Sequence, residues 1–190
     1  MTHGPGHAVG YAVFDTAVGR CGVAWSEAGI VGVQLPEAGG PHATGRRLAK
    51  RFPDARSVSA PPPVARAIIG MTALLEGTRD DLRDVVLDVR GVPPFNARVY
   101  ALARAILPGS TSTYGELARQ LGDPTAARGV GQALAQNPFP LVVPCHRILA
   151  AGGGLGGFSA RGGRDTKRAL LAIEGATSVD QLPLFGGKSD

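Results

Sequence analysis

Glycine and proline divide this chain into short segments, and this limits the length of every helix and strand that it can form. The 190 residues include 28 glycines and 15 prolines. Apolar runs at positions 11–15, 21–25 and 30–35 are separated by glycine, which is typical of a small antiparallel meander. The patterns also predict helices over 42–51 and 64–75 and a strand over 84–89. Residues 1–90 are therefore expected to form a small N-terminal α+β domain.

The sequence Gly-Val-Pro-Pro at 91–94 marks the expected start of a second domain, which extends to residue 175. A helix is predicted over 95–107 because apolar residues recur there with helical spacing. A last helix is predicted over 166–174, with Asp165 as its N-cap. Residues 176–190 are expected to be a flexible tail. The predicted apolar face of the helix over 95–107 consists of Phe95, Val99, Leu102 and Ile106.

Two short helices are predicted between these longer ones. Thr113 and Glu116 have the spacing of a capping box and begin the first helix, which Gly122 ends. Asp123 and Pro124 supply an N-cap and a first-turn proline for the second helix. Two short helices joined by a tight glycine turn are typical of a helix-turn-helix, although an ordinary αα-hairpin has the same pattern. We therefore expect a helical, winged-helix-like C-terminal domain.

A cysteine beside a histidine is the sharpest chemical feature of the chain. A short strand predicted over 141–143 leads into Pro-Cys-His-Arg at 144–147. A thiolate is a strong nucleophile, and a nearby histidine can take the proton of the thiol. Neighbouring residues on a strand point to opposite faces, so His146 reaches Cys145 only if the backbone turns or through a water. Glu174 is the candidate to orient His146. The alternative is that Cys145 is a buried structural cysteine.

Composition restricts the class of protein. A net charge of +5 suits a polyanionic partner such as nucleic acid, and 44% hydrophobic residues are enough for a real core. Two cysteines without a Cys-x-x-Cys pair suggest neither a disulfide framework nor a zinc site. The N-terminus has no signal pattern, and no apolar run approaches the length of about 18 residues that a membrane helix needs. We therefore expect a cytoplasmic protein with no metal and no membrane segment.

Several segments, in order and spacing, resemble the O6-alkylguanine-DNA alkyltransferases, also called methylated-DNA–protein-cysteine methyltransferases. The run 113–118 resembles the start of their helix-turn-helix, and 124–131 resembles their recognition helix. The run 137–148, Asn-Pro-Phe-Pro-Leu-Val-Val-Pro-Cys-His-Arg-Ile, resembles their active-site stretch. Lys167 and the residues around Glu174 resemble their closing helix. The likeness covers residues 93–175. Residues 1–90 resemble the family only in being a small α+β domain that precedes the catalytic one.

The resemblance implies direct-reversal DNA repair. The O6-alkyl group of a flipped guanine would move to Cys145 once and irreversibly, and no cofactor would be needed. The resemblance also implies that His146 is the base, acting through a water, and that Glu174 completes the relay. Asn137 would tie the helix-turn-helix to the active-site strand. Tyr114 would contact the flipped nucleotide and donate a hydrogen bond to the leaving guanine.

The resemblance also implies a face for double-stranded DNA. The second short helix would enter the minor groove, and Arg128 would fill the hole that the extruded base leaves. Thr113 would also contact DNA. Because this groove is only about 6 Å wide, a helix that enters it should carry small side chains. Tight helix packing is the alternative for Ala126 and Ala133, which flank Val130. The small side chains are those of Ala126, Ala127, Gly129, Gly131, Ala133 and Ala135.

The glycine-rich stretch that follows formally matches the dinucleotide motif G-x-G-x-x-G at 152–157. No βαβ unit is predicted around it, so we expect a flexible wall of the base pocket instead. Ile148, Phe158 and Ser159 are the further pocket candidates, with the backbone N–H of Ser159 directed to O6. The segment 158–167 is longer than in many family members, which leaves the range of accepted alkyl groups open.

Two other functions compete with alkyl transfer. A non-catalytic protein that binds alkylated DNA would resemble this family but lack the acceptor, and the presence of Cys145 argues against it. A sequence-specific regulator would need base-reading side chains on the second short helix, which has mostly alanine and glycine.

The C-terminal tail contains a second motif. The run from Gln181 to Phe185, Gln-Leu-Pro-Leu-Phe, resembles the short peptides by which bacterial repair proteins bind the DNA sliding clamp. The alternative is that these apolar residues fold back onto the protein's own surface. We expect the protein to be a monomer.

Overall fold

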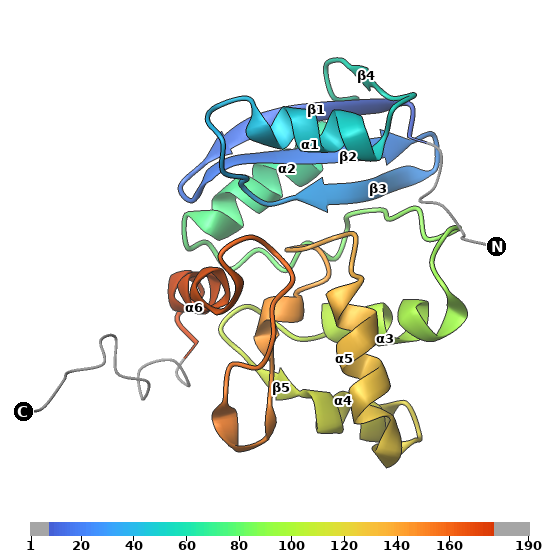
Figure 1. The fold of residues 1–190 in the computed structure, drawn as a ribbon, viewed down its shortest axis with the longest axis vertical. Coiled ribbons are helices and arrows are strands. Elements are labelled where there is room, and N and C mark those ends of the chain that lie inside the picture. Colours follow the sequence, from blue (N-terminus) through green and yellow to red (C-terminus); the bar gives the residue numbers. More distant parts are fainter. Residues whose placement is uncertain (1–7, 177–190) are drawn as a thin grey trace, which may run out of the picture.

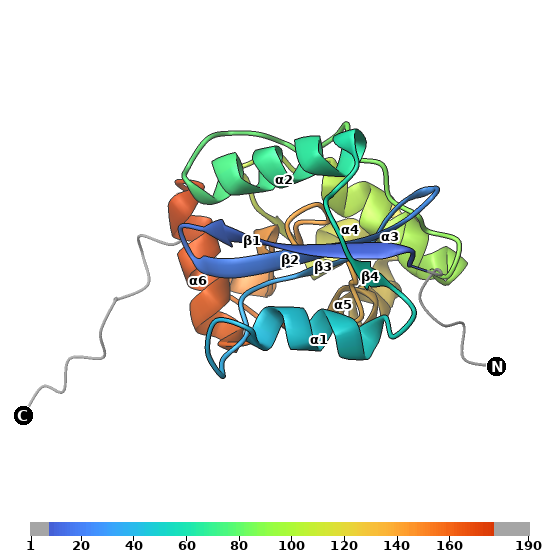
Figure 2. The same ribbon diagram turned by 90° about the horizontal axis from the view of Figure 1, so that it is seen from above.

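The structure, a computed structural model, describes residues 8–176 of the chain. The strands β1 (Gly10–Thr16), β2 (Gly19–Ser26) and β3 (Gly29–Gln34) form the predicted antiparallel meander (Figure 1). The short strand β4 (Arg56–Ser57) pairs with β1 in parallel, which gives the sheet order β3-β2-β1-β4. Two helices, α1 (Ala43–Arg51) and α2 (Pro62–Leu75), cover opposite faces of this sheet (Figure 2).

The prediction of a strand over residues 84–89 is wrong. Only an isolated bridge forms, between Leu87 and Ile30 of β3. The carboxylate of Asp88 accepts hydrogen bonds from both the backbone and the side chain of Arg90, at 3.2 and 2.8 Å. These bonds hold the chain in a local bend, so the pairing ends after one bridge.

Helices dominate the second half of the chain (Figure 1). Two short parallel strands, β5 (Ser112–Thr113) and β6 (Ile148–Leu149), pair with each other and join the early and late segments of this half. The expected α+β fold class is therefore confirmed. The elements of this half are α3 (Pro94–Arg104), β5 (Ser112–Thr113), α4 (Tyr114–Gln120), η1 (Pro124–Ala126), α5 (Ala127–Ala135), η2 (Cys145–Arg147), β6 (Ile148–Leu149), η3 (Ala151–Gly153) and α6 (Gly163–Ile173).

Helix α3 confirms the predicted face in part, because Val99 is buried and Leu102 and Ile106 are partly buried against the core. Asn96, Val99, Tyr100 and Ala103 are its buried residues, whereas Phe95 is 36% exposed. Polar bonds to the end of α5 explain the difference. The Tyr100 hydroxyl donates to the carbonyl of Ala133 at 2.8 Å, and Asn96 donates to the Gln136 side chain at 3.1 Å. A count of apolar side chains alone misses residues that are buried through such bonds.

The predicted N-cap of α4 is confirmed, but the reciprocal half of the capping box does not form, because the Glu116 carboxylate accepts from the Ser112 hydroxyl at 3.1 Å. The hydroxyl of Thr113 accepts a hydrogen bond from the backbone N–H of Glu116 at 3.1 Å. Gly122 has a φ of +86°, which glycine adopts without strain, and Asp123 then caps η1. Helices α4 and α5 pack against each other where the helix-turn-helix was predicted.

Two predicted boundaries near the active-site segment are wrong. Residues 141–143 form turns, not a strand, and Leu141 has a φ of +74°. The strand begins later, at Ile148, where it pairs with β5. Helix α6 begins at Gly163 without a side-chain cap, so Asp165 lies in its first turn and pairs with Arg168 at 3.1 Å.

One hydrophobic core contains side chains from both halves of the chain. The edge strand β3 also contacts the second half directly, because the N–H of Val33 donates to the carbonyl of Pro138 at 2.8 Å. Among the helices within residues 8–176, none has the length and apolar character needed to cross a membrane. The run from Gln181 to Phe185 lies outside the described residues.

Candidate active site

Cys145 lies in a 3₁₀ turn, η2, so the chain turns at the position where the sequence required a turn. Its side chain is buried, with 7% of the residue exposed, and it borders a cavity of about 210 Å³. Three elements meet at this cavity: the start of α4, the second half of α5 and the glycine-rich loop. The lining residues are Tyr114, Gly131, Leu134, Ala135, Cys145, Gly157, Phe158 and Ser159.

His146 and Glu174 form a buried pair beside Cys145. The Nε2 atom of His146 lies 2.8 Å from Oε1 of Glu174, and both side chains are at most 3% exposed. Burial lowers the pKa of His146, against the opposing effect of the Glu174 carboxylate. The Nδ1 atom of His146 is buried and has no hydrogen-bond partner among the described residues.

Arg147 completes this cluster, and the sequence analysis gave it no role. Its Nε donates to Oε2 of Glu174 at 2.9 Å, and its Nη2 donates to Oε1 at 2.8 Å. Its Nη1 donates to the carbonyl of Ile106 at 2.6 Å. Burial raises the pKa of Glu174, but hydrogen bonds from His146 and Arg147 outweigh it and lower the pKa to about 2. The signal in the sequence was a second polar residue, Arg147, directly after His146 in the mainly apolar run 141–149.

The ionised carboxylate fixes the tautomer of His146. A carboxylate can only accept hydrogen bonds, so Nε2 of His146 must carry the proton that it shares with Glu174. Because its pKa is lowered, the imidazole is neutral near neutral pH. The unpartnered Nδ1 is then a free proton acceptor, as a general base requires.

Asn137 braces the loop that carries Cys145. Its Nδ2 donates to the carbonyl of Val143, and its Oδ1 accepts from the N–H of Phe139, both at 2.9 Å. Burial raises the pKa of the Cys145 thiol, while Asn137 and the charge of Lys167 act in the opposite direction. The resting thiol therefore keeps its proton until a base removes it.

Lys167 is the second residue to which the sequence analysis assigned no role. It is completely buried, and its ammonium group donates to the carbonyls of Ile148 and Gly157. The same group lies 5.9 Å from the ring centre of Tyr114. Burial lowers the pKa of Lys167 to about 8. Lys167 thus joins α6 to β6 and to the glycine-rich wall of the cavity.

The predicted pocket residues have different positions. Tyr114, Phe158 and Ser159 line the cavity, and the Tyr114 hydroxyl donates to the carbonyl of Gly157 at 3.5 Å. Burial raises the pKa of Tyr114, so its hydroxyl keeps a proton to donate. Ile148 does not line this cavity: its side chain is completely buried in the core, and its carbonyl is bonded to Lys167.

The residues predicted to contact DNA lie on and before α5. Arg128 is exposed and does not line the cavity. Thr113, Ala126 and Ala127 are partly buried. Gly129 and Gly131 are also partly buried, and a β-carbon at either position would contact a ring, that of Phe95 at 3.4 Å or that of Tyr114 at 3.8 Å. Both distances are ordinary van der Waals contacts, so packing within the chain leaves room for a β-carbon at either position.

The chain is similar to known proteins over most of its length. Residues 94–176 match the family model described as 6-O-methylguanine DNA methyltransferase, DNA binding domain. A methylated-DNA–protein-cysteine methyltransferase of Mycolicibacterium paratuberculosis is 47% identical over 102 residues, which are 54% of this chain and 60% of that protein. The protein of the same description from Mycobacterium tuberculosis strain H37Rv is 39% identical over 142 residues, which are 74% of this chain and 84% of that protein.

The fold is also similar to a solved structure of such a protein. The crystal structure of Mycobacterium tuberculosis OGT in complex with DNA superposes with a TM-score of 0.70 at 30% identity. The match covers 90% of this chain and 99% of the other. This chain therefore belongs to the methylated-DNA–protein-cysteine methyltransferase family.

Proposed function

We propose that this protein repairs DNA by transferring the O6-alkyl group of a damaged guanine to the sulfur of Cys145, once per molecule. The observation that carries the proposal is the position of Cys145, which borders a cavity beside a buried histidine–carboxylate–arginine cluster. Membership of the methyltransferase family supports the same reaction.

In the reaction, the thiolate of Cys145 attacks the alkyl carbon and a carbon–sulfur bond forms. The bond between that carbon and O6 breaks, and its electron pair stays on the guanine. The guanine takes up one proton, which balances the proton lost by the thiol. The damaged base itself supplies the alkyl group, so the reaction needs no cofactor. The thioether is stable, so the protein acts once.

The cluster behind Cys145 would supply the proton transfer. His146 would take the thiol proton on Nδ1, through a water, because Glu174 holds its other nitrogen. Tyr114 would donate a hydrogen bond to the guanine as it leaves, since it lines the cavity and keeps its proton. Asn137 would hold the loop that positions the thiol.

DNA would bind through α5. A base inside a duplex cannot reach a buried thiol, so the damaged nucleotide must be extruded into the cavity. The exposed Arg128, at the second position of α5, would fill the gap left in the stack. The small residues of α5 suit the narrow minor groove. DNA in the solved structure of the Mycobacterium tuberculosis relative supports this partner.

Mass spectrometry of the intact protein tests the reaction. After mixing with duplex DNA that contains O6-methylguanine, we expect the mass to rise by one methyl group, located on Cys145. The Cys145→Ser variant should show no increase and should still bind the duplex, because binding depends mainly on backbone contacts. Tight binding by the wild-type protein without any mass change would instead support the non-catalytic alternative.

We further propose that the protein is a monomer and that its C-terminal tail docks on the DNA sliding clamp. The support is the Gln-Leu-Pro-Leu-Phe sequence from Gln181 to Phe185, whose apolar residues would fill a groove while the glutamine sets the register. Tethering would raise the local concentration of a single-use protein near DNA. A titration against purified clamp should show binding by the full chain and none by Leu184→Ala/Phe185→Ala. Equal binding by both proteins would contradict clamp docking.

We also propose a cytoplasmic location. A reducing compartment keeps thiols free, which an alkyl acceptor requires. Cys21 and Cys145 are both free in the structure.

A further inference from the structure

The excess of positive charge is concentrated in two separate blocks of the chain. Residues 94–176 contain nine Lys and Arg against four Asp and Glu, a net charge of +5. Residues 42–57 contain five Lys and Arg against one Asp, a net charge of +4. The rest of the chain contains six Lys and Arg against ten Asp and Glu, a net charge of −4. The second basic block is therefore α1 and the loop after it, outside the segment 94–176.

The cations of α1 repel one another. Arg46 and Lys50 are separated by one helical turn, and so are Arg47 and Arg51, so both pairs place like charges side by side. Such pairs destabilise a helix unless something neutralises them. Helix-dipole effects favour only the cations in the last turn, and leave Arg46 and Arg47 unexplained.

Partners for these charges are scarce within the described part of the chain. The ion pair recorded for α1 joins Arg47 to Glu37 at 3.9 Å, the outer limit of such contacts. Arg46 donates to the carbonyl of Gly39, and Arg51 lies over the ring of Phe52 at 4.9 Å. Arg46, Arg47 and Lys50 are all exposed. The helix thus presents a cationic surface to solvent.

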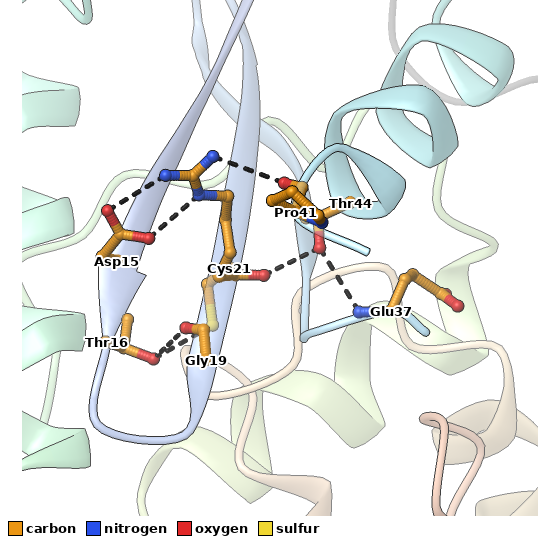
Figure 3. A network of polar contacts seen from close by, with 8 residues as sticks. Asp15, Thr16, Gly19, Cys21, Glu37, Pro41 and Thr44 are labelled. Atoms are coloured by element: carbon orange, nitrogen blue, oxygen red, sulfur yellow. Dashed lines mark hydrogen bonds and ion pairs between the residues drawn. The ribbon is translucent and has the colours of Figure 1, made fainter. Parts of the chain in front are cut away.

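Helix α1 is held rigidly on the sheet. The hydroxyl of Thr44 donates to the carbonyl of Arg20 at 2.7 Å. It also accepts from the N–H of Glu37 at 3.3 Å (Figure 3). On its inner face Leu48 is completely buried, and it lies so close to Gly22 that a β-carbon there would clash. These contacts set the backbone positions from which the exposed cations extend.

Helix α1 and the C-terminal end of α5 border the same cavity. Seen from above, α1 and α5 lie toward one side of the sheet and α2 lies on the other (Figure 2). A cavity of about 420 Å³ lies between them, and Arg51 of α1 and Gln136 at the end of α5 both line it. Asp88 also lines this cavity, and Arg128 lies at the opposite, N-terminal end of α5.

We propose that the exposed cations of α1 (Arg46, Arg47 and Lys50) form a second, sequence-independent contact surface for the phosphate backbone of duplex DNA. The proposal rests on the DNA-binding function proposed above but uses a surface that the alkyl transfer does not need. Phosphate contacts of this kind hold a protein on undamaged DNA and speed its search without reading sequence. This suits a protein that must find rare lesions.

The salt dependence of binding to a long undamaged duplex tests the surface. Each phosphate contact contributes about 0.9 to the slope of log K against log salt concentration, so Arg46→Gln/Lys50→Gln should reduce the slope by about 1.8. Arg46→Lys should keep the wild-type slope, because it keeps the charge. Arg66→Gln/Arg79→Gln, which removes two exposed cations from α2 and the segment after it, is the matched control and should also keep it.

A wild-type slope in the α1 double variant would overturn the proposal, and so would an equal loss in the matched control. Thermal unfolding of each variant checks that the fold is intact. Methyl transfer by the wild-type protein is measured separately by mass. A protein that transfers methyl groups but shows no effect of the α1 variant contradicts only this inference, whereas absence of transfer contradicts the proposed function.

Discussion

Arg147 donates two hydrogen bonds to the carboxylate of Glu174, at 2.9 and 2.8 Å, and both side chains are buried. The same carboxylate contacts His146. One negative charge therefore serves two neighbours, since it balances the guanidinium and orients the imidazole. The stability of the fold and the proton transfer proposed for Cys145 depend on the same group.

Replacing Arg147 with Met should lower the free energy of unfolding by about 3–5 kcal/mol, because it leaves the Glu174 charge buried and unpaired. The double variant Arg147→Met/Glu174→Leu removes both charges and should recover much of this loss. It should remain inactive in methyl transfer, because nothing then orients His146. Denaturant unfolding and intact mass measure the two effects. If the single variant were as stable as the wild type, the Arg147–Glu174 pair would contribute nothing to the free energy of unfolding.

The same carboxylate predicts how stability depends on pH. The pKa of Glu174 is lowered from 4.5 to about 2, so the folded state binds its proton less readily than the unfolded state. Its contribution is complete above pH 4.5 and is lost as the pH falls toward 2, and it amounts to about 3 kcal/mol. Unfolding curves recorded over this range should show a smaller loss of stability for Glu174→Gln. Parallel pH dependence in the two proteins would contradict the prediction.

The fold could largely be predicted from local patterns. The glycine-separated runs of the first half predicted β1, β2 and β3, and the Thr113–Glu116 pair predicted the start of α4. These signals act between residues that are close in the sequence. The predicted strand over 84–89 was wrong because Asp88 bends the chain through bonds that alternation does not reveal.

The site could be predicted only in part, because its polar groups pair across long separations. Arg147 reaches Ile106, which is 41 positions away, and Lys167 reaches Ile148, which is 19 positions away. No spacing rule links such positions. The contacts of Arg147 and Lys167 therefore depend on the packing of α6 against η2, which no local pattern predicts.

Lys167 should tune the acidity of the thiol. Its charge lowers the pKa of Cys145, and its own pKa of about 8 keeps it charged near neutral pH. Lys167→Met should slow methyl transfer and shift its pH profile to higher pH. The fraction of Cys145 present as thiolate should fall roughly tenfold for each unit by which the pKa of Cys145 rises. Lys167→Arg should retain the wild-type profile. If the Arg variant lost as much as the Met variant, the shape of the side chain, not its charge, would be what matters.

Arg128 should matter for duplex DNA far more than for a free base. It is exposed on α5 and does not line the cavity, so its replacement should change stability by less than about 0.5 kcal/mol. We expect Arg128→Ala to slow transfer from O6-methylguanine in a duplex much more than transfer from the free modified base, because only the duplex needs a side chain to fill the gap. Arg119→Ala removes one exposed cation from α4 and is the control for loss of a positive charge. Single-turnover rates on the two substrates provide the measurement. Equal losses of rate on the duplex and on the free base would assign Arg128 a structural role. Equal losses of rate in the Arg119 and Arg128 variants would show that Arg128 contributes only its charge.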